Sequence, residues 1–266
     1  MIYPFSNRIS GCLLTALALM QLVPATAYTI VAGKPAQSAA TAANPHTNTV
    51  VVPIHGEDYG ERSAQFWKWE FSLPVSNHPL FINSGVVDCT AGQSGSVWFI
   101  GGTFSTNPDP NNPTVTLGQA DRTCTIPSGK ALFFPIVNSE CSTINGDNLG
   151  DTSEKGLRAC AMFFANFINP NTLSATVDGV ALTALSQYRV QSPQFSFGPL
   201  PNDNIFQFFA LTAPAGTTAR SVSDGVHLML YPLSPGAHTI HFHGEADFPD
   251  GSKFIEDITY HLTVMH

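Results

Sequence analysis

Four cysteines that follow an export signal constrain the fold of this chain more than any other feature. Arg8 precedes an apolar run over residues 12–23, and small residues then lead to Ala27. This order is typical of a cleaved signal peptide, and the run is shorter than the about 20 residues that span a bilayer. The cysteines beyond it are Cys89, Cys124, Cys141 and Cys160. An even number in an oxidising compartment predicts two disulfide bonds.

Three pairings of the four cysteines are open. We favour Cys89 with Cys124 and Cys141 with Cys160, because the members of each pair lie near each other in the sequence. The chain has no C-x-x-C motif, so neither a thiolate zinc site nor a redox motif is expected.

The export signal also sets the expected domain organisation. We expect a signal peptide over residues 1–27, a flexible segment rich in Ala, Thr, Pro and Asn over 28–48, and one domain over 49–266. Cys12 is the first residue of the apolar run, whereas the cysteine of a lipoprotein signal follows the run, so a lipid anchor is not expected. The mature protein is expected to be secreted or periplasmic, with no membrane span.

Charge and composition exclude some classes of partner. The chain has 11 basic and 19 acidic side chains, and loss of Arg8 with the signal leaves 10 against 19, a net charge of −9. Nucleic acids and anionic membranes are bound by basic patches, so neither partner is expected. Only 11% of residues are charged, whereas 21 glycines, 20 prolines and 19 phenylalanines are present. This balance favours an extracytoplasmic, mostly β protein.

Residue patterns predict two helices among many strands. Asp58 can cap a helix over residues 59–72 that Pro74 ends, and a second helix is expected over 152–168. A nearly continuous apolar run over 130–137 predicts a strand buried on both faces, and Asp178-Gly179 is a hairpin turn. Other predicted strands cover 49–54, 96–100, 114–117, 122–127, 188–190, 194–197, 205–209, 225–231, 238–243 and 254–264. These elements predict a single β-sandwich or jelly-roll-like domain with two packed α-helices.

Several segments of the chain resemble an uncharacterised family of secreted bacterial β-sandwich proteins. They include W-x-W-x-F-S-L-P, N-H-P, C-x-x-G-Q-S-G and R-x-C-x-I-P-x-G-K-A-L-F-F-P-I, and they cover residues 67–74, 77–79, 89–95, 97–99, 122–136, 188–193 and 233–240. The resemblance implies one secreted domain and carries no activity.

A histidine cluster near the C-terminus is a candidate metal site. Ile240 and Phe242 define the apolar face of one strand, and even-numbered residues define that of the next, so pairing the two faces places even numbers opposite even numbers. His241, His243 and His261 then share the other face, with His241 opposite His261 or one pair away. Imidazoles at that spacing suit copper or zinc. The same face also carries threonines and Asp257, a composition typical of an ordinary solvated strand.

Two carboxylates are candidate catalytic acids or bases. Glu70 lies among Trp67, Trp69 and Phe71, and an apolar setting would raise its pKa. Glu245 follows the histidine cluster. The alternative interpretation for Glu70 is an exposed residue on the helix surface or a salt bridge in the core. The tryptophans could stack on sugar rings or fill the core.

Two classes of function remain open at this stage. One is a non-catalytic extracytoplasmic protein that binds a surface glycan or a protein ligand. The other is a secreted copper- or zinc-dependent enzyme that uses His241, His243 and His261 with Glu245 nearby.

Overall fold

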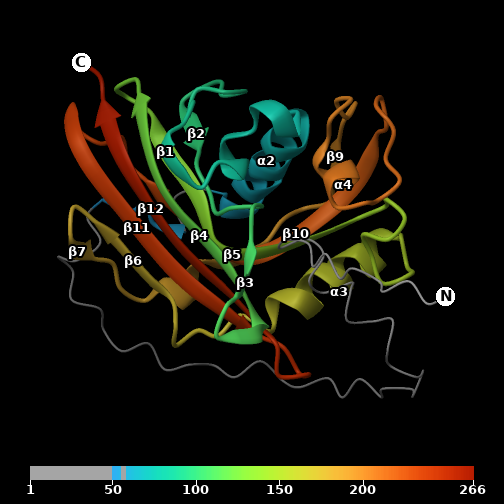
Figure 1. Cartoon of the computed structure of the whole chain (residues 1–266). Helices are drawn as coiled ribbons and strands as arrows, with labels where there is room; N and C mark the ends of the chain where they lie inside the picture. The colour runs from blue at the N-terminus through green and yellow to red at the C-terminus, as the bar shows by residue number, and fades with distance from the viewer. Residues whose placement is uncertain (1–49, 55–57) are drawn as a thin grey trace.

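The computed structural model describes residues 50–54 and 58–266. The signal peptide predicted over 1–27 and the flexible segment predicted over 28–48 lie outside these residues. The described chain forms two mixed β-sheets, of seven and five strands, that pack face to face with three helices (Figure 1). This confirms the mostly β, two-sheet fold.

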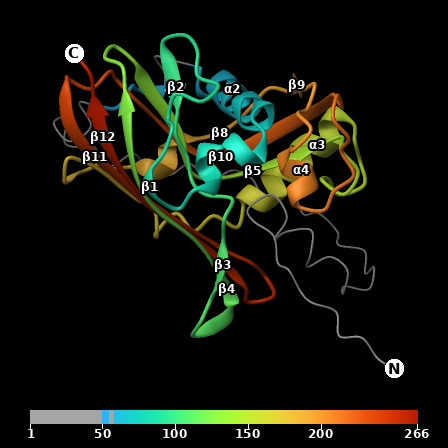
Figure 2. The same cartoon turned by 45° about the horizontal axis from the view of Figure 1, so that its top comes forward.

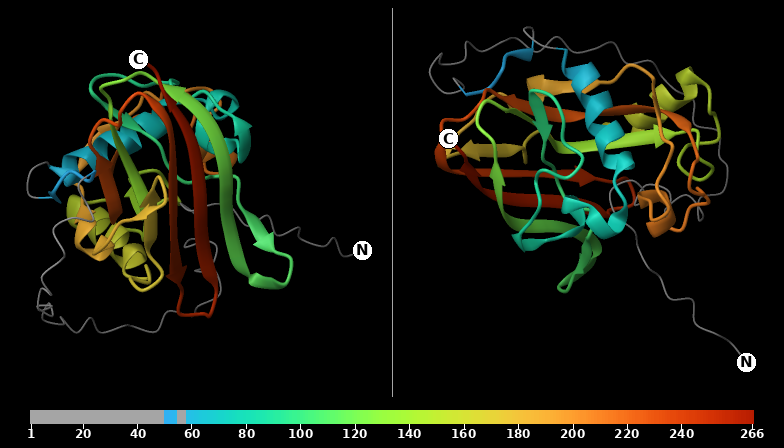
Figure 3. Two further views of the ribbon diagram at one scale, coloured as in Figure 1. Left: turned by 90° about the vertical axis from the view of Figure 1, so that its left-hand side faces the viewer. Right: turned by 90° about the horizontal axis from the view of Figure 1, so that it is seen from above.

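The seven-stranded sheet supplies one side of the core. Its order is β1-β4-β12-β11-β6-β7, with β3 beside β4. The long strands β4, β12 and β11 run side by side (Figure 3), β12 parallel to β4 and antiparallel to β11. The strands are β1 (Ser84–Val86), β3 (Asn107–Asp109), β4 (Asn112–Ile126), β6 (Ser174–Val177), β7 (Val180–Ala181), β11 (Gly236–Asp247) and β12 (Lys253–Val264).

The five-stranded sheet packs against it in the order β2-β5-β10-β8, with β9 beside β10. Its strands are β2 (Val97–Phe99), β5 (Ala131–Ser142), β8 (Arg189–Gln191), β9 (Phe195–Phe197) and β10 (Ala219–Leu230). Residues 131–137 of β5 are all buried, as the apolar run predicts. Phe134 of β5 meets Phe242 of β11 with ring centroids 5.0 Å apart, which joins the two sheets.

The helices lie on different sides of the five-stranded sheet. α2 (Tyr59–Ser72) fills the opening between the two sheets and runs across their strands in the view from above (Figures 1 and 3). α3 (Glu154–Ala165) packs on the other side, against β5 and β10 (Figure 2). α4 (Ile205–Phe208) lies beside α2, with the ring centroids of Phe206 and Phe71 4.8 Å apart. Short 3-10 turns η3 (Val75–Asn77), η4 (Pro79–Phe81) and η5 (Leu185–Tyr188) connect the elements. No helix among the described residues is long and apolar enough to cross a membrane.

Local signals predict α2 and the two disulfides correctly. The Asp58 side chain accepts a hydrogen bond from the Glu61 backbone N–H at 3.0 Å, and α2 spans the predicted residues. Both favoured cysteine pairs are confirmed, Cys89 with Cys124 and Cys141 with Cys160. Two disulfides indicate an extracytoplasmic environment. The second helix is shorter than predicted, because Ser153 caps it and Asn166 ends it.

Two strand predictions were wrong, over 205–209 and 49–54, and two correctly predicted strands join into one. Residues 205–209 begin α4, because the Asn204 side chain accepts from the Gln207 N–H and starts a helical turn. Residues 114–117 and 122–127 belong largely to one strand, β4, which continues through the expected gap because β12 pairs with it throughout. In the described part of residues 49–54, Val51 makes an isolated bridge with Leu230 instead of a strand.

Candidate functional site

Two buried glutamates from distant parts of the chain line one small cavity. Glu70 comes from α2 and Glu256 from β12, and their exposed fractions are 0% and 4%. The free volume of the cavity is about 20 Å³, enough for one water-sized group, and it is partly open to solvent. The other lining residues are Phe66, Trp67, Leu80, Gly102, Thr103, Phe104, Pro135 and Asn138.

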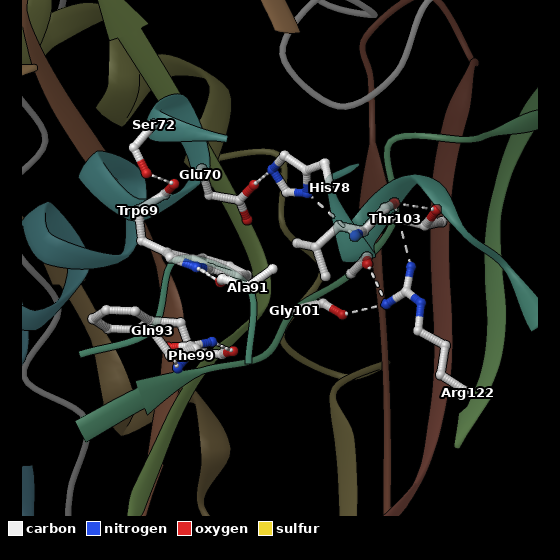
Figure 4. A network of polar contacts seen from close by, with 12 residues as sticks. Trp69, Glu70, Ser72, His78, Ala91, Gln93, Phe99, Gly101, Thr103 and Arg122 are labelled. Carbon is white, nitrogen blue, oxygen red and sulfur yellow. Dashed lines mark hydrogen bonds and ion pairs between the residues drawn. The ribbon is translucent and has the colours of Figure 1, made fainter. Parts of the chain in front are cut away.

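His78 fixes one oxygen of Glu70. The Leu80 backbone N–H donates to His78 Nδ1 at 3.2 Å, so that nitrogen carries no proton. His78 Nε2 therefore carries the proton and lies 2.9 Å from Glu70 Oε2 (Figure 4). Glu70 Oε1 has no hydrogen-bond partner among the described residues. Burial raises the pKa of Glu70, and the hydrogen bond from His78 and the charge of Arg122 oppose the rise.

Glu256 is held by the segment that leads out of β2. Its Oε1 accepts a hydrogen bond from the Thr103 backbone N–H at 3.0 Å. Burial raises the pKa of Glu256 to about 8, although the Thr103 hydrogen bond and the charge of Arg122 lower it. At neutral pH this carboxyl group is therefore largely protonated in the unliganded protein. Among the described residues, no lysine or arginine forms an ion pair with Glu70 or Glu256.

Arg122 organises the backbone beside the cavity. Its side chain is fully buried on β4 and donates to the carbonyl oxygens of Gly101 and Gly102 at 3.0 and 2.8 Å. It also donates to the carbonyls of Leu80 and Ile82 and to the Tyr260 hydroxyl. The guanidinium thus fixes the segment after β2 that carries Thr103, and it contributes one positive charge near both glutamates.

A second pair of buried carboxyl groups lies beside the Cys141–Cys160 disulfide. Glu140 on β5 accepts a hydrogen bond from Ser221, and Asp147 accepts one from Ser142 at 2.5 Å. Burial raises the pKa of both groups, to about 7 for Asp147. Hydrogen bonding between the two acids also raises the pKa of Glu140 and lowers that of Asp147.

The three candidate histidines share the outer face of the seven-stranded sheet. The register pairs Thr239 with His261 and His241 with Thr259, so the prediction that His241 lies within one pair of His261 is confirmed. Each imidazole meets a carboxylate. His241 Nε2 lies 2.7 Å from Asp257 Oδ1, and His261 Nε2 lies 3.1 Å from Asp121 Oδ1.

Within the described residues, no group of three or more His, Cys, Asp or Glu side chains could hold a metal ion as it stands. His243 lies 3.6 Å from Glu245 and 4.0 Å from Asp257. Glu245 also pairs with Lys253 at 3.4 Å. The two candidate catalytic carboxylates are therefore apart, because Glu245 belongs to the outer face and Glu70 lines the internal cavity.

Glu256 and Arg122 were not among the predicted site residues. Their positions on the apolar faces of β12 and β4 could have identified them. The apolar face of β12 consists of even-numbered residues, and Glu256 is even-numbered between Phe254 and Ile258. Arg122 occupies the same kind of position on β4. An ionisable residue in a buried alternation indicates a buried charge.

Comparisons with known family models and with curated proteins find no match for this chain.

Proposed function

We propose that this protein is a secreted or periplasmic, non-catalytic binding protein that holds one polar group of a ligand between Glu70 and Glu256. One observation carries the proposal. Two buried carboxyl groups line one cavity, and neither is neutralised by a lysine or arginine ion pair among the described residues.

Two buried carboxyl groups without a lysine or arginine partner do not stabilise the fold by themselves. Removing a carboxylate from water costs several kcal/mol unless partners compensate it, and apolar side chains of similar volume often stabilise a core better. Ionisable groups with strongly shifted pKa values also cluster at functional sites. A ligand that binds both glutamates is therefore the best explanation for their presence in the core.

The size of the cavity favours binding over catalysis. Pockets that enclose a whole small molecule measure roughly 300–1,000 Å³, whereas this cavity measures about 20 Å³. One group can enter, but a scissile bond together with an attacking group cannot. The rest of the ligand, a surface glycan or a protein, would remain outside. All three tryptophans are buried, so stacking of an exposed tryptophan on a sugar is not part of the proposal.

A thermal-shift screen tests the proposal. The panel contains sugars, amino sugars, amines and alcohols, and the proteins are the wild type, Glu256→Gln and Glu61→Gln. Glu61 is an exposed residue of α2 and provides the matched control. At least one compound should raise the Tm of the wild type and of Glu61→Gln, but not that of Glu256→Gln. A panel in which no compound distinguishes Glu256→Gln from the control contradicts the proposal.

The second candidate, a secreted metal-dependent enzyme, is favoured by the position of Asp257. One of its oxygens faces His241 and the other faces His243. Copper or zinc would require these side chains to turn toward a common point. Calorimetric titration of tag-free protein with each ion tests this candidate. One equivalent should bind to the wild type and none to His241→Ala, and equal binding by both proteins would exclude the histidine site.

A further inference from the structure

We infer that the cavity between Glu70 and Glu256 binds a primary ammonium group. This inference rests on the function proposed above and names the chemical class of the ligand.

The charges around the cavity favour a cation. When Glu70 and Glu256 are both ionised they contribute two negative charges, and Arg122 contributes one positive charge. The Arg122 hydrogen bonds are directed to carbonyl oxygens and to Tyr260, not to the glutamates. With His78 neutral, as its Nδ1 contact indicates, one negative charge is left over. A single ammonium neutralises it, and its N–H donors match the unpartnered Glu70 Oε1.

The size and walls of the cavity fit the same group. An ammonium is about as large as the water molecule that a volume of about 20 Å³ admits. Phe66, Trp67 and Phe104 supply aromatic rings among the walls. Aromatic rings attract an ammonium through their quadrupole, and they hold an anion poorly. A guanidinium or a quaternary ammonium is too large for this volume.

Three glycines leave room for the Glu256 side chain between the sheets. In the seven-stranded sheet, Glu256 is paired with Gly118 on β4 and with Gly244 on β11, so neither neighbouring strand places a side chain beside it. A Cβ on Gly102 would overlap the Glu256 carboxylate. A Cβ on Gly244 would lie 2.5 Å from Val137, so glycine there also allows β5 to approach. The cavity is therefore a specific feature of this packing.

Ammonium binding should displace the proton of Glu256. The charged groups that act on Glu256 are Glu70 from α2, which raises its pKa, and Arg122 from β4, which lowers it. His78 meets Glu70 from the turn between η3 and η4, and Tyr260 lies farther along β12. A simple alkylamine such as ethanolamine remains largely protonated below about pH 9. Its affinity should therefore increase between pH 6 and pH 8, as Glu256 ionises more readily.

Matched probes separate an ammonium from a hydroxyl group. Ethanolamine and ethylene glycol have similar sizes, and they differ in that one terminal hydroxyl is replaced by an ammonium. Glucosamine and glucose make the same comparison on a sugar, so the two pairs distinguish a free amine from an amino sugar. Each probe is titrated by calorimetry into the full-length mature protein at pH 7.

The inference predicts binding of at least one amine and none of its hydroxyl counterpart. Glu256→Gln and Glu70→Gln should each weaken amine binding at least about tenfold, whereas Glu61→Gln should not change it. Circular dichroism shows whether each variant folds. If a hydroxyl probe binds as well as its amine and depends on Glu256, the ammonium inference fails and the proposed binding function stands. If no probe in this test or in the wider panel depends on Glu256, both fail.

Discussion

Replacing Glu256 with glutamine should make the protein less sensitive to alkaline pH. Glutamine has the shape of the protonated acid, and its side-chain oxygen can still accept the Thr103 hydrogen bond that Glu256 accepts at 3.0 Å. Burial raises the pKa of Glu256 from 4.5 to about 8 in the folded protein. The folded wild type favours the protonated form of Glu256, and it loses this proton at high pH.

The magnitude follows from this shift. Below pH 4.5 the group is protonated in both the folded and the unfolded chain, so its full contribution to stability is present. That contribution is lost progressively as pH rises to about 8. A shift of about 3.5 units at 1.36 kcal/mol per unit corresponds to about 5 kcal/mol.

Urea denaturation at a series of pH values from 5 to 9 measures the effect. The free energy of unfolding of Glu256→Gln minus that of the wild type should rise by about 4 kcal/mol across this range, because roughly 1 kcal/mol of the total is already lost at pH 5. Comparing the two proteins cancels the contributions of other acids, and Glu61→Gln should differ from the wild type by a constant amount. A difference between Glu256→Gln and the wild type that does not change with pH would refute the assignment of a protonated, buried Glu256.

Three further substitutions test other parts of the structure. Burial raises the pKa of Asp147 to about 7, so the wild type loses the stability that protonated Asp147 contributes between pH 4 and 7. Asp147→Asn should therefore be more stable than the wild type at pH 8, relative to the same comparison at pH 4, by up to about 4 kcal/mol. An unchanged pH profile in urea denaturation would contradict this. Replacing both Cys141 and Cys160 with alanine should lower the free energy of unfolding by about 3 kcal/mol, since the cross-link closes a loop of 19 residues. An unchanged Tm in calorimetry would count against a structural disulfide. Gly102→Ala should cost about 1–3 kcal/mol, because the added methyl meets the Glu256 carboxylate, and the cost should shrink in a Glu256→Ala background; additive costs would show that the two residues do not touch.

Alternating patterns predicted much of the seven-stranded sheet. The rule that even numbers face even numbers was correct, with Ile240 opposite Tyr260 and Phe242 opposite Ile258. It works because one face is buried, so a slip by one residue would expose every apolar side chain. The same rule places Glu256 in the core. This follows only if a charged residue at an apolar position of the alternation is read as a buried charge.

Other features depend on contacts that the local sequence does not encode. The segment 205–209 is mostly apolar and aromatic, as a strand can be, but Asn204 caps residues 205–208 as a helical turn. The loop around Asp147 has the composition of a solvated turn, yet Ser142 on β5 binds that carboxylate within the interior. Convergence of Glu70 with Glu256 requires α2 to lie between the sheets, which is a property of the whole fold.

A carboxyl NMR titration tests the central claim most directly. Selectively carbon-13-labelled glutamate allows the Glu256 carboxyl signal, assigned by its loss in Glu256→Gln, to be followed from pH 4 to pH 10 with and without saturating ethanolamine. The account predicts a midpoint near pH 8 in the free protein and a midpoint at least one unit lower, roughly a tenfold change in proton affinity, in the presence of the amine. A midpoint near 4.5 in the free protein, or one that ethanolamine leaves unchanged, would contradict a buried carboxylate site that binds an ammonium group.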